Sequence, residues 1–420
     1  MSSFPDPHGQ APSGAVRFPK RGFFSARPWL SALAAGLLLG ACGNAAPARE
    51  PEPAAAPARP APSPARAPAT LDAWLQAEAA ADRFSGAVLV AQGDRVLFRR
   101  AYGLADRENS VPLTPEHRFR IASLSKQFTA AAVLRLQDQG KLSVNDPLCR
   151  WVQPCPEAWA PVTLHHLLSH TAGVPDLMGR PDWGQVRWAP HTPAGLTAAS
   201  AALPLEFPPG ERVGYSNAAY NLLGQVVERA SGRSFAEQLR ADVFPAAGLQ
   251  NTGYDDGSTA LAVGYRPTAE GLLPQRQSNA DVVFAAGALY SSVDDLHRWS
   301  RALHGGRVLS PRSYAGMIAA AEPGRYRARE RRGVPQVFAY GLFVGSPGLR
   351  VRPGFADRQI FHTGSWAGFR ALTTYQPDSD VTVVVLSNQY DAEEAVLLTT
   401  QRALAETLGR PLPTAVAPTS

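Results

Sequence analysis

Ser123 and Lys126 stand three residues apart in the string SLSKQF, at the start of a segment rich in helix-forming residues. On a helix this spacing puts both side chains on one face, within reach of each other. Lys126 is one of three lysines, with Lys20 and Lys141, and arginine fills every other basic position. A guanidinium keeps its proton in proteins, whereas a buried amine can lose it and act as a base. The pair predicts a serine nucleophile beside a lysine base, although the string alone fits a solvated helix start equally well.

Two later strings carry further groups suited to this chemistry. Tyr215-Ser216-Asn217 lies at the entry to a predicted helix, where a tyrosine hydroxyl can relay a proton and an asparagine can either cap the helix or reach into a cleft. His362-Thr363-Gly364 is predicted to open a strand, where the glycine allows the backbone of a substrate to approach closely.

The motifs S-L-S-K, Y-S-N and H-T-G follow one another in an order that resembles the serine β-lactamase and penicillin-binding-protein superfamily. The resemblance is to the branch that holds class C β-lactamases, D-Ala-D-Ala carboxypeptidases, D-aminopeptidases and related esterases. It covers most of residues 71–408, with connecting strings such as LLSHTAGVPD and AAGALYSSVDDLHRW. It implies that Ser123 is the nucleophile of an acyl-enzyme mechanism and that Lys126 and Tyr215 share the role of base.

The same resemblance implies the residues that hold the substrate. The backbone N–H groups of Ser123 and Ser365 would form an oxyanion hole, and neither a metal nor a cofactor is implied. The substrate-binding residues that it implies are Asn217, His362, Thr363, Gly364 and Ser365.

The third motif departs from that of class C β-lactamases, which usually have K-T-G where this chain has His362. H-T-G occurs in peptidase and amidase members and in some esterases, so we expect hydrolysis of an amide, a peptide or an ester. A β-lactamase is the alternative, and a lipoprotein that keeps the fold and only binds wall peptides is an alternative of another class. Because a histidine can be neutral, His362 also predicts a stronger pH dependence than a lysine would give.

Other strings have structural interpretations. Ser169-His170-Thr171 is a second H-T string, but it follows a predicted helix and enters a turn closed by Pro175. His166 and His170 have the spacing of a zinc pair, yet no H-E-x-x-H motif and no acidic third ligand accompany them. The absence of a G-x-S-x-G string disfavours a nucleophile-elbow hydrolase.

The elements that must position these residues lie at both ends of the chain and between them. Alternating and apolar strings predict strands within 85–106, 338–345, 364–377 and 381–388, and helical spacing predicts helices over 71–84, 123–140, 218–232 and 392–408. The predicted fold class is α/β (α+β): one antiparallel sheet built from N- and C-terminal strands and flanked by helices, with a large, mostly helical insertion. This is the β-lactamase/transpeptidase-like architecture that the resemblance implies.

The chain of 420 residues, 45% hydrophobic and 18% charged, is long enough for a large core. We expect one hydrolase domain over 70–409, with a sheet subdomain of 70–104 and 336–409, a helical subdomain of 105–335 and a flexible tail of 410–420. Of the net charge of +6, residues 1–70 contribute +4, from seven basic and three acidic residues. The remaining +2 is too little to predict a nucleic-acid partner.

The first 41 residues have the pattern of a signal peptide. Basic residues precede an apolar run from Trp29 to Ala41, which is too short for a bilayer span, and Leu39-Gly40-Ala41-Cys42 resembles a bacterial lipobox. We expect lipidation of Cys42, with cleavage without lipidation as the alternative. Residues 42–69 are rich in alanine and proline and predict an extended tether.

The number and spacing of the cysteines are consistent with an exported protein. Once Cys42 carries lipid, Cys149 and Cys155 remain as a pair, and the cell envelope permits disulfides; a free buried pair is the alternative. The predicted location is therefore the cell envelope, with the membrane as a partner through the lipid anchor and a peptide or small molecule, such as one derived from the cell wall, as substrate.

Changing Cys42→Ala tests the anchor. If the thiol carries lipid, the variant should move from the membrane fraction to the soluble fraction, because the signal peptide alone gives no lasting attachment. Fractionation followed by immunoblotting measures this, and unchanged partitioning of the variant would contradict the prediction.

Overall fold

The computed structural model describes residues 64–277, 280–319, 329–331, 334–345, 351–352 and 358–415. The chain divides into two compact units, Met1–Arg59 and Pro60–Ser420, and every described residue belongs to the second. The predicted signal peptide, Cys42 and most of the predicted tether lie outside the described residues. Among the residues that are described, no helix is both long and apolar enough to cross a membrane.

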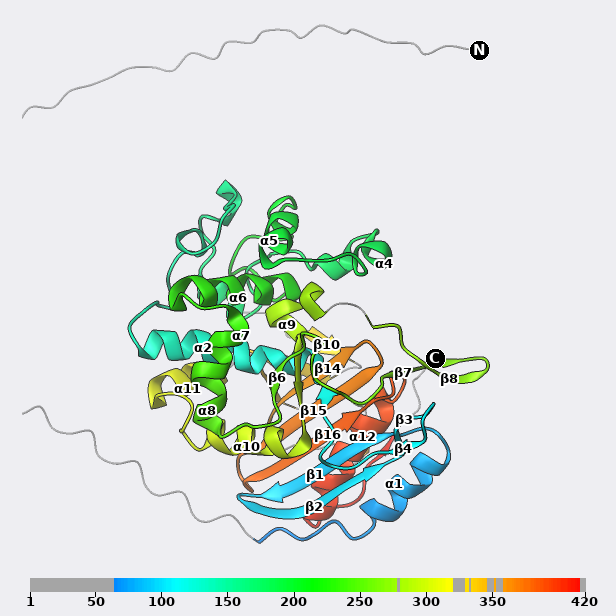
Figure 1. The fold of residues 1–420 in the computed structure, drawn as a ribbon. Helices are drawn as coiled ribbons and strands as arrows, with labels where there is room; N and C mark the ends of the chain where they lie inside the picture. Colours follow the sequence, from blue (N-terminus) through cyan, green and yellow to red (C-terminus); the bar gives the residue numbers. More distant parts are fainter. Residues whose placement is uncertain are drawn as a thin grey trace, which may run out of the picture. The chain divides into compact units, whose positions relative to one another are not determined.

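An eight-stranded sheet joins the two ends of the described chain (Figure 1). All of its strand pairs are antiparallel, and β1 from the N-terminal side pairs with β16 from the C-terminal side, with Gly86 opposite Ser387. In sheet order the strands are β10 (Arg329–Arg331), β11 (Val334–Phe338), β12 (Phe343–Gly345), β14 (Gln359–Trp366), β15 (Phe369–Gln376), β16 (Val381–Ser387), β1 (Gly86–Gln92) and β2 (Arg95–Tyr102). The predicted sheet of terminal strands is confirmed.

Helices cover both faces of this sheet, which explains why its central strands are apolar on both sides. All seven residues of β16, VTVVVLS, are buried. Successive side chains of a strand point to opposite faces. Accordingly, Val383 and Val385 pack in one cluster with helices α1 (Leu71–Ala80) and α12 (Glu393–Thr407). Val384 and Leu386 join the cluster that contains α2 (Ser125–Asp138) and α10 (Val293–His304).

The helical region lies between the strands in sequence, as predicted, and its two longest predicted helices are present. The helices are α1 (Leu71–Ala80), α2 (Ser125–Asp138), α3 (Leu164–Leu168), α4 (Trp183–Val186), α5 (Pro193–Ala201), α6 (Asn217–Ser231), α7 (Phe235–Gln238), α8 (Phe244–Ala247), α9 (Phe284–Gly287), α10 (Val293–His304), α11 (Pro311–Ile318) and α12 (Glu393–Thr407). Short strand pairs complete the fold: β3 (Leu104–Asp106) with β4 (Val111–Pro112), β7 (Tyr265–Thr268) with β8 (Gly271–Pro274), β13 (Val351–Arg352) with β17 (Thr414–Ala415), and β9 (Leu289–Ser291) between β5 (Phe119–Arg120) and β6 (Gly253–Tyr254).

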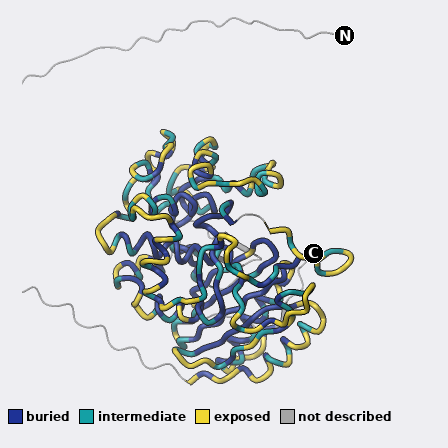
Figure 2. The backbone as a smooth tube through the Cα atoms, viewed as in Figure 1, coloured by how far each residue is buried: buried dark blue, intermediate teal, exposed yellow. Residues whose placement is uncertain are grey.

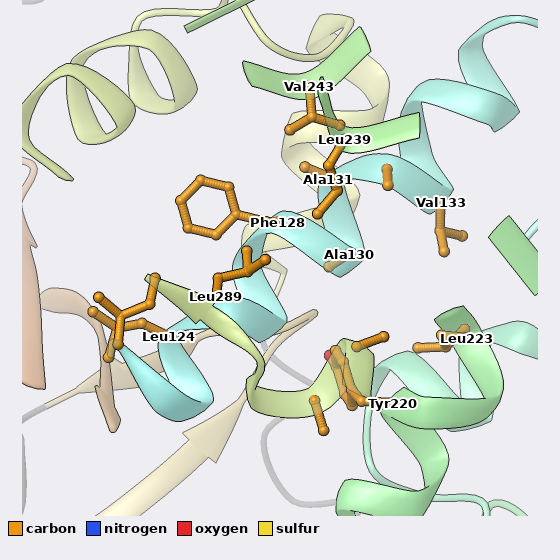
Figure 3. Packing of buried hydrophobic residues seen from close by; sticks show 14 of the residues in the cluster. Leu124, Phe128, Ala130, Ala131, Val133, Tyr220, Leu223, Leu239, Val243 and Leu289 are labelled. Carbon is orange, nitrogen blue, oxygen red and sulfur yellow. The ribbon is translucent and has the colours of Figure 1, made fainter. Parts of the chain in front are cut away.

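Helix α2 runs through the middle of the core (Figure 3). Its residues are buried around nearly the whole circumference from Ser125 to Leu134. Phe128 stacks on Trp299 of α10 with ring centroids 4.1 Å apart, and Tyr220 of α6 lies in the same cluster. The burial of each residue along the backbone is drawn in Figure 2. Any polar side chain on α2 must therefore find its partners inside the protein.

Three predicted boundaries differ from the structure. The sheet already includes β10 and β11, which begin before residue 336. The end of the predicted tether contacts the domain, because the Arg66 N–H donates to the Thr407 carbonyl and Ala65 is buried. The predicted flexible tail contains β17, which pairs with β13.

Cys149 and Cys155 form a disulfide with their Cα atoms 5.4 Å apart. The bond closes a short loop that packs, through both half-buried cysteines, against the main hydrophobic cluster. It therefore fixes a surface loop of the helical region.

Candidate active site

Ser123 lies at a sharp entry into helix α2. Strand β5 ends at Arg120, and the short 3-10 turn η1 (Ala122–Leu124) leads into α2. Ala122 has a φ of +49°, a left-handed conformation that is unfavourable for a residue with a Cβ. Strain of this kind persists only where the surroundings enforce it, and Ala122 is buried between β14 and α9. The turn brings Ser123 to the wall of a cleft, at the start of a helix that is buried from Ser125 to Leu134.

Lys126 is completely buried beneath Ser123, and three oxygen atoms surround its Nζ. The Asn217 Oδ1 and the Ala286 carbonyl each lie 2.8 Å from Nζ, and the Ser123 Oγ lies 3.2 Å from it. A neutral amine has two N–H groups and one lone pair. When the two N–H groups donate to Asn217 and Ala286, the lone pair faces Ser123 and can accept its proton.

The surroundings lower the pKa of Lys126 to about 7, chiefly because burial disfavours the ammonium form, while the negative charge of Asp176 opposes the shift. At neutral pH a large share of the protein therefore has a neutral amine at this position. The predicted lysine base has the environment that this role requires.

Asp176 fixes the orientation of Asn217, a link that the sequence analysis did not predict. The Asn217 Nδ2 donates to Asp176 Oδ2 over 2.8 Å. Because a carboxylate can only accept hydrogen bonds, this contact turns the Asn217 Oδ1 toward Lys126. Asp176 is the last residue of the string LLSHTAGVPD, and no catalytic motif of the sequence marks it.

The second acceptor of Lys126, the Ala286 carbonyl, is held by helix α6. The Ala286 N–H donates to the Asn221 Oδ1 over 3.2 Å. Gly224 allows α9 to approach, since a Cβ at this position would lie 2.4 Å from the Phe284 ring. Both acceptors of the lysine thus depend on α6.

Tyr215 approaches Ser123 from the other side. Its hydroxyl donates to the Ser123 Oγ over 2.9 Å. The ring stacks on His170 with centroids 4.6 Å apart, and the His170 Nδ1 accepts from the Ser216 N–H over 3.2 Å. The Ser216 Oγ caps α6 by accepting from the Ala219 N–H, so Asn217 is free to reach the cleft and does not cap the helix. His170, from the second H-T string, thus holds Tyr215 and Ser216 in place.

The H-T-G motif lies within β14 and does not open it, because the strand begins at Gln359. The predicted reason for its glycine is wrong. A Cβ on Gly364 would lie 2.2 Å from the Ile121 carbonyl oxygen, so the glycine makes room for the chain's own backbone just before Ser123 and not for a substrate. The missing side chain allows β14 to lie against the entry to α2.

His362 is buried, and the pH dependence predicted from this residue is also wrong. Burial, together with the charge of Lys126, lowers the pKa of His362 to about 3. The histidine is therefore neutral over the whole physiological range, and it does not give the pH dependence predicted from its type. Lys126, with its pKa of about 7, is the group that titrates at neutral pH.

An open cleft brings most of the predicted site residues together. Some of the predicted residues do not line the cleft. Lys126 lies beneath its floor, Gly364 packs against Ile121, and the Cys149–Cys155 disulfide lies elsewhere in the helical region. Lining residues that the sequence analysis did not assign include Met178, Val283, Phe338, Phe343 and Trp366. The predicted site residues that line it are Ser123, Tyr215, Asn217, His362, Thr363 and Ser365.

A family model described as Beta-lactamase matches residues 46–407, which is most of the chain. The chain belongs to the beta-lactamase family. This assignment agrees with the mixed α/β fold and its antiparallel sheet, and it places the protein among serine hydrolases of the β-lactamase and penicillin-binding-protein type.

Relatives within this family carry several activities in their names. The chain is 29% identical to penicillin-binding protein 4* of Bacillus subtilis over 332 residues, which are 74% of this chain and 70% of the relative. It is 37% identical to esterase EstB of Burkholderia gladioli over 203 residues, 44% of this chain and 51% of the esterase. The octameric penicillin-binding protein homologue of Pyrococcus abyssi is similar in structure, with a TM-score of 0.69, 26% identity and coverage of 81% of this chain and 77% of that one.

Changing Asp176→Asn should alter the pH profile of ester hydrolysis. Removing the carboxylate removes the charge that favours the ammonium form of Lys126, so the rise of kcat/KM with pH should move to lower pH. The Asn217 amide also loses a charge-assisted partner, which should lower the plateau about tenfold. Stopped-flow kinetics with a p-nitrophenyl ester between pH 5 and 9 measures both effects.

Asp182→Asn is the matched control, since Asp182 pairs with Arg180 on the surface. It should leave both the midpoint and the plateau unchanged. A lower plateau in Asp176→Asn with an unmoved midpoint would contradict the role of Asp176 in setting the state of Lys126.

Proposed function

We propose that the protein is a serine hydrolase that forms an acyl-enzyme on Ser123 and acts on an amide, a peptide or an ester. The observation that carries the proposal is the position of the Ser123 Oγ. It lies 3.2 Å from the Lys126 Nζ and 2.9 Å from the Tyr215 hydroxyl, at the wall of an open cleft.

In the first step Lys126 accepts the Ser123 proton while Oγ bonds to the substrate carbonyl carbon. The carbonyl oxygen becomes an oxyanion between the N–H groups of Ser123 and Ser365. The close approach of Gly364 to Ile121 supports this arrangement, because it brings the strand that carries Ser365 against the turn that carries Ser123. Fixed donors of this kind contribute a factor of about 10² to 10³ each in rate.

In the second step the bond to the leaving group breaks, and the proton held by Lys126 passes through the Tyr215 hydroxyl to the departing oxygen or nitrogen. Tyr215 suits this transfer because it contacts Ser123 directly and its ring lies 4.9 Å from the lysine Nζ. Water then attacks the acyl-enzyme carbonyl carbon and gives a proton to Lys126. The bond from that carbon to the Ser123 Oγ breaks, Lys126 returns the proton to Oγ, and the acid leaves. The reaction balances without a cofactor.

The choice of substrate follows from the neutral His362 and from the relatives. A neutral imidazole on the H-T-G wall offers no cation for the carboxylate of a β-lactam, which favours amide, peptide or ester hydrolysis over efficient β-lactam hydrolysis. The partial match to an esterase supports the ester. A binding protein without catalysis has no need of a buried lysine, so the intact Ser123, Lys126 and Tyr215 favour an enzyme.

The proposal includes a location. The signal peptide pattern, the lipobox at Cys42 and the tether support an exported enzyme held at the cell envelope by lipid. Its substrates would then be peptides or small molecules of that compartment, including those derived from the cell wall.

Covalent labelling tests the catalytic role of Ser123 and Lys126. The purified protein should react with a fluorescent fluorophosphonate, and Ser123→Ala should not react. Lys126→Arg should be almost as damaging, with at least a 10³-fold loss of ester hydrolysis, because a guanidinium keeps its charge but cannot accept the proton. Gel fluorescence and initial rates measure the two effects.

Lys141→Arg is the control, because Lys141 is exposed. It should be labelled and active like the parent. A largely active Lys126→Arg protein would mean that the lysine serves through its charge, and a parent that neither labels nor turns over esters, peptides or D-amino-acid amides would sink the catalytic proposal.

A further inference from the structure

Two arginines and two tryptophans stack against one another, and one of the four, Trp366, lines the cleft. The Arg187 guanidinium lies 4.8 Å from the Trp188 ring and 5.0 Å from the Trp366 ring, and the Arg276 guanidinium lies 4.3 Å from the Trp188 ring. The four residues come from three segments: the residues just after α4, the residues after β8 and the end of β14. We call this group the cationic rim.

The cationic rim has donors without acceptors. The Arg187 Nε and the Trp366 Nε1 are both buried and have no hydrogen-bond partner among the described residues. Neither Arg187 nor Arg276 forms an ion pair with an acidic residue of the described chain, although most buried or half-buried arginines of the domain do. Each arginine therefore carries a positive charge that no acidic side chain of the described residues neutralises, and this charge is available to an anion.

Trp366 connects the cationic rim to the chemistry. It lines the same cleft as Ser123, and it is the last residue of β14. His362 lies four residues earlier on the strand, which corresponds to about 13 Å. The two residues therefore mark two ends of the cleft wall.

The two ends of the cleft differ in character. Tyr215 and His362 lie near the phenylalanines Phe338 and Phe343, and Tyr215 is the group from which the leaving group would take its proton. The leaving group belongs at that end. The acyl part of a substrate then extends toward Trp366 and the cationic rim.

We propose that the cationic rim binds a carboxylate on the acyl side of the substrate, so that the enzyme prefers acyl groups that end in a negative charge. The proposal rests on the proposed function and adds a substrate class to it. The two terminal nitrogens of the Arg187 guanidinium, which are not among the buried unpaired atoms, match a carboxylate in two parallel hydrogen bonds. Arg276 contributes charge at the exposed side.

The test compares two esters that differ only in that carboxylate. The p-nitrophenyl monoester of glutaric acid and p-nitrophenyl valerate have acyl chains of five carbons and the same leaving group. The parent should prefer the glutarate, and the preference should fall as salt rises. Arg187→Gln should lower the ratio of kcat/KM for glutarate over valerate about tenfold, mostly through KM, and Arg187→Lys should retain part of it.

Arg180→Gln is the matched control, since Arg180 lies in the same region of the chain but pairs with Asp182. It should leave the ratio unchanged. If Arg187→Gln lowers hydrolysis of both esters equally, the cationic rim only braces the loop, and the proposal is wrong.

A second comparison separates the two sources of a carboxylate. A peptide that ends in D-alanyl-D-alanine carries its carboxylate on the leaving group, and the C-terminal amide of the same peptide lacks it. Arg187→Gln should not change the ratio between these two substrates. A changed peptide ratio with an unchanged ester ratio would place the carboxylate on the leaving group and overturn the proposal. A parent that labels at Ser123 but shows no preference for glutarate would overturn this inference alone, whereas failure to label or to turn over any substrate would overturn the proposed function.

Discussion

The site depends on the burial of one amine. Lowering the pKa of Lys126 from its ordinary value of 10.5 to about 7 corresponds to roughly 5 kcal/mol between its two protonation states. Between these pH values the unfolded chain binds more protons than the folded one, so the contribution of this residue to the stability of the folded state rises with pH from about 7 to 10.5. Below pH 7 both states carry the proton, and the full cost applies without further change. The surrounding structure must offset that cost. It does so with a helix buried on all sides and with two oxygen acceptors fixed beside the amine.

Backbone contacts tighter than any side chain would allow hold this arrangement together. Gly364 brings β14 against Ile121, two residues before Ser123, and Gly341, with a φ of +66°, packs where a Cβ would lie 2.4 Å from the Lys126 carbonyl oxygen. The strained Ala122 lies between such contacts. Because β14 pairs through β15 and β16 with a strand from the other end of the chain, the geometry at Ser123 depends on the complete sheet. This explains why a sheet made from both termini and an inserted helical region must form together before the site exists.

Many elements of the fold and most residues of the site could be predicted from residue patterns. The features that could not be predicted depend on contacts between distant parts of the chain. The apolar strings of β1 and β16 and the helix ending at Gly232 were predictable because periodicity and local stop signals are encoded in neighbouring residues. Ser123, Lys126 and Tyr215 were recognisable from their motifs. Asp176 was not, because its role depends on a contact across 41 positions of sequence with Asn217. The state of His362 and the purpose of Gly364 were predicted wrongly for the same reason, because both follow from how the fold packs around them. Burial, with the charge of Lys126, sets the state of His362, and the Ile121 backbone requires the glycine.

Direct titration of Lys126 tests the central claim. The chain has only three lysines, so a protein labelled with ¹³C at the lysine ε-carbon gives few NMR signals, and Lys141→Arg identifies one of them without touching the site. We expect the Lys126 signal to shift with a midpoint near pH 7. A midpoint near the ordinary value of about 10.4 would show that the lysine remains charged at neutral pH, and it would contradict its role as the base that activates Ser123.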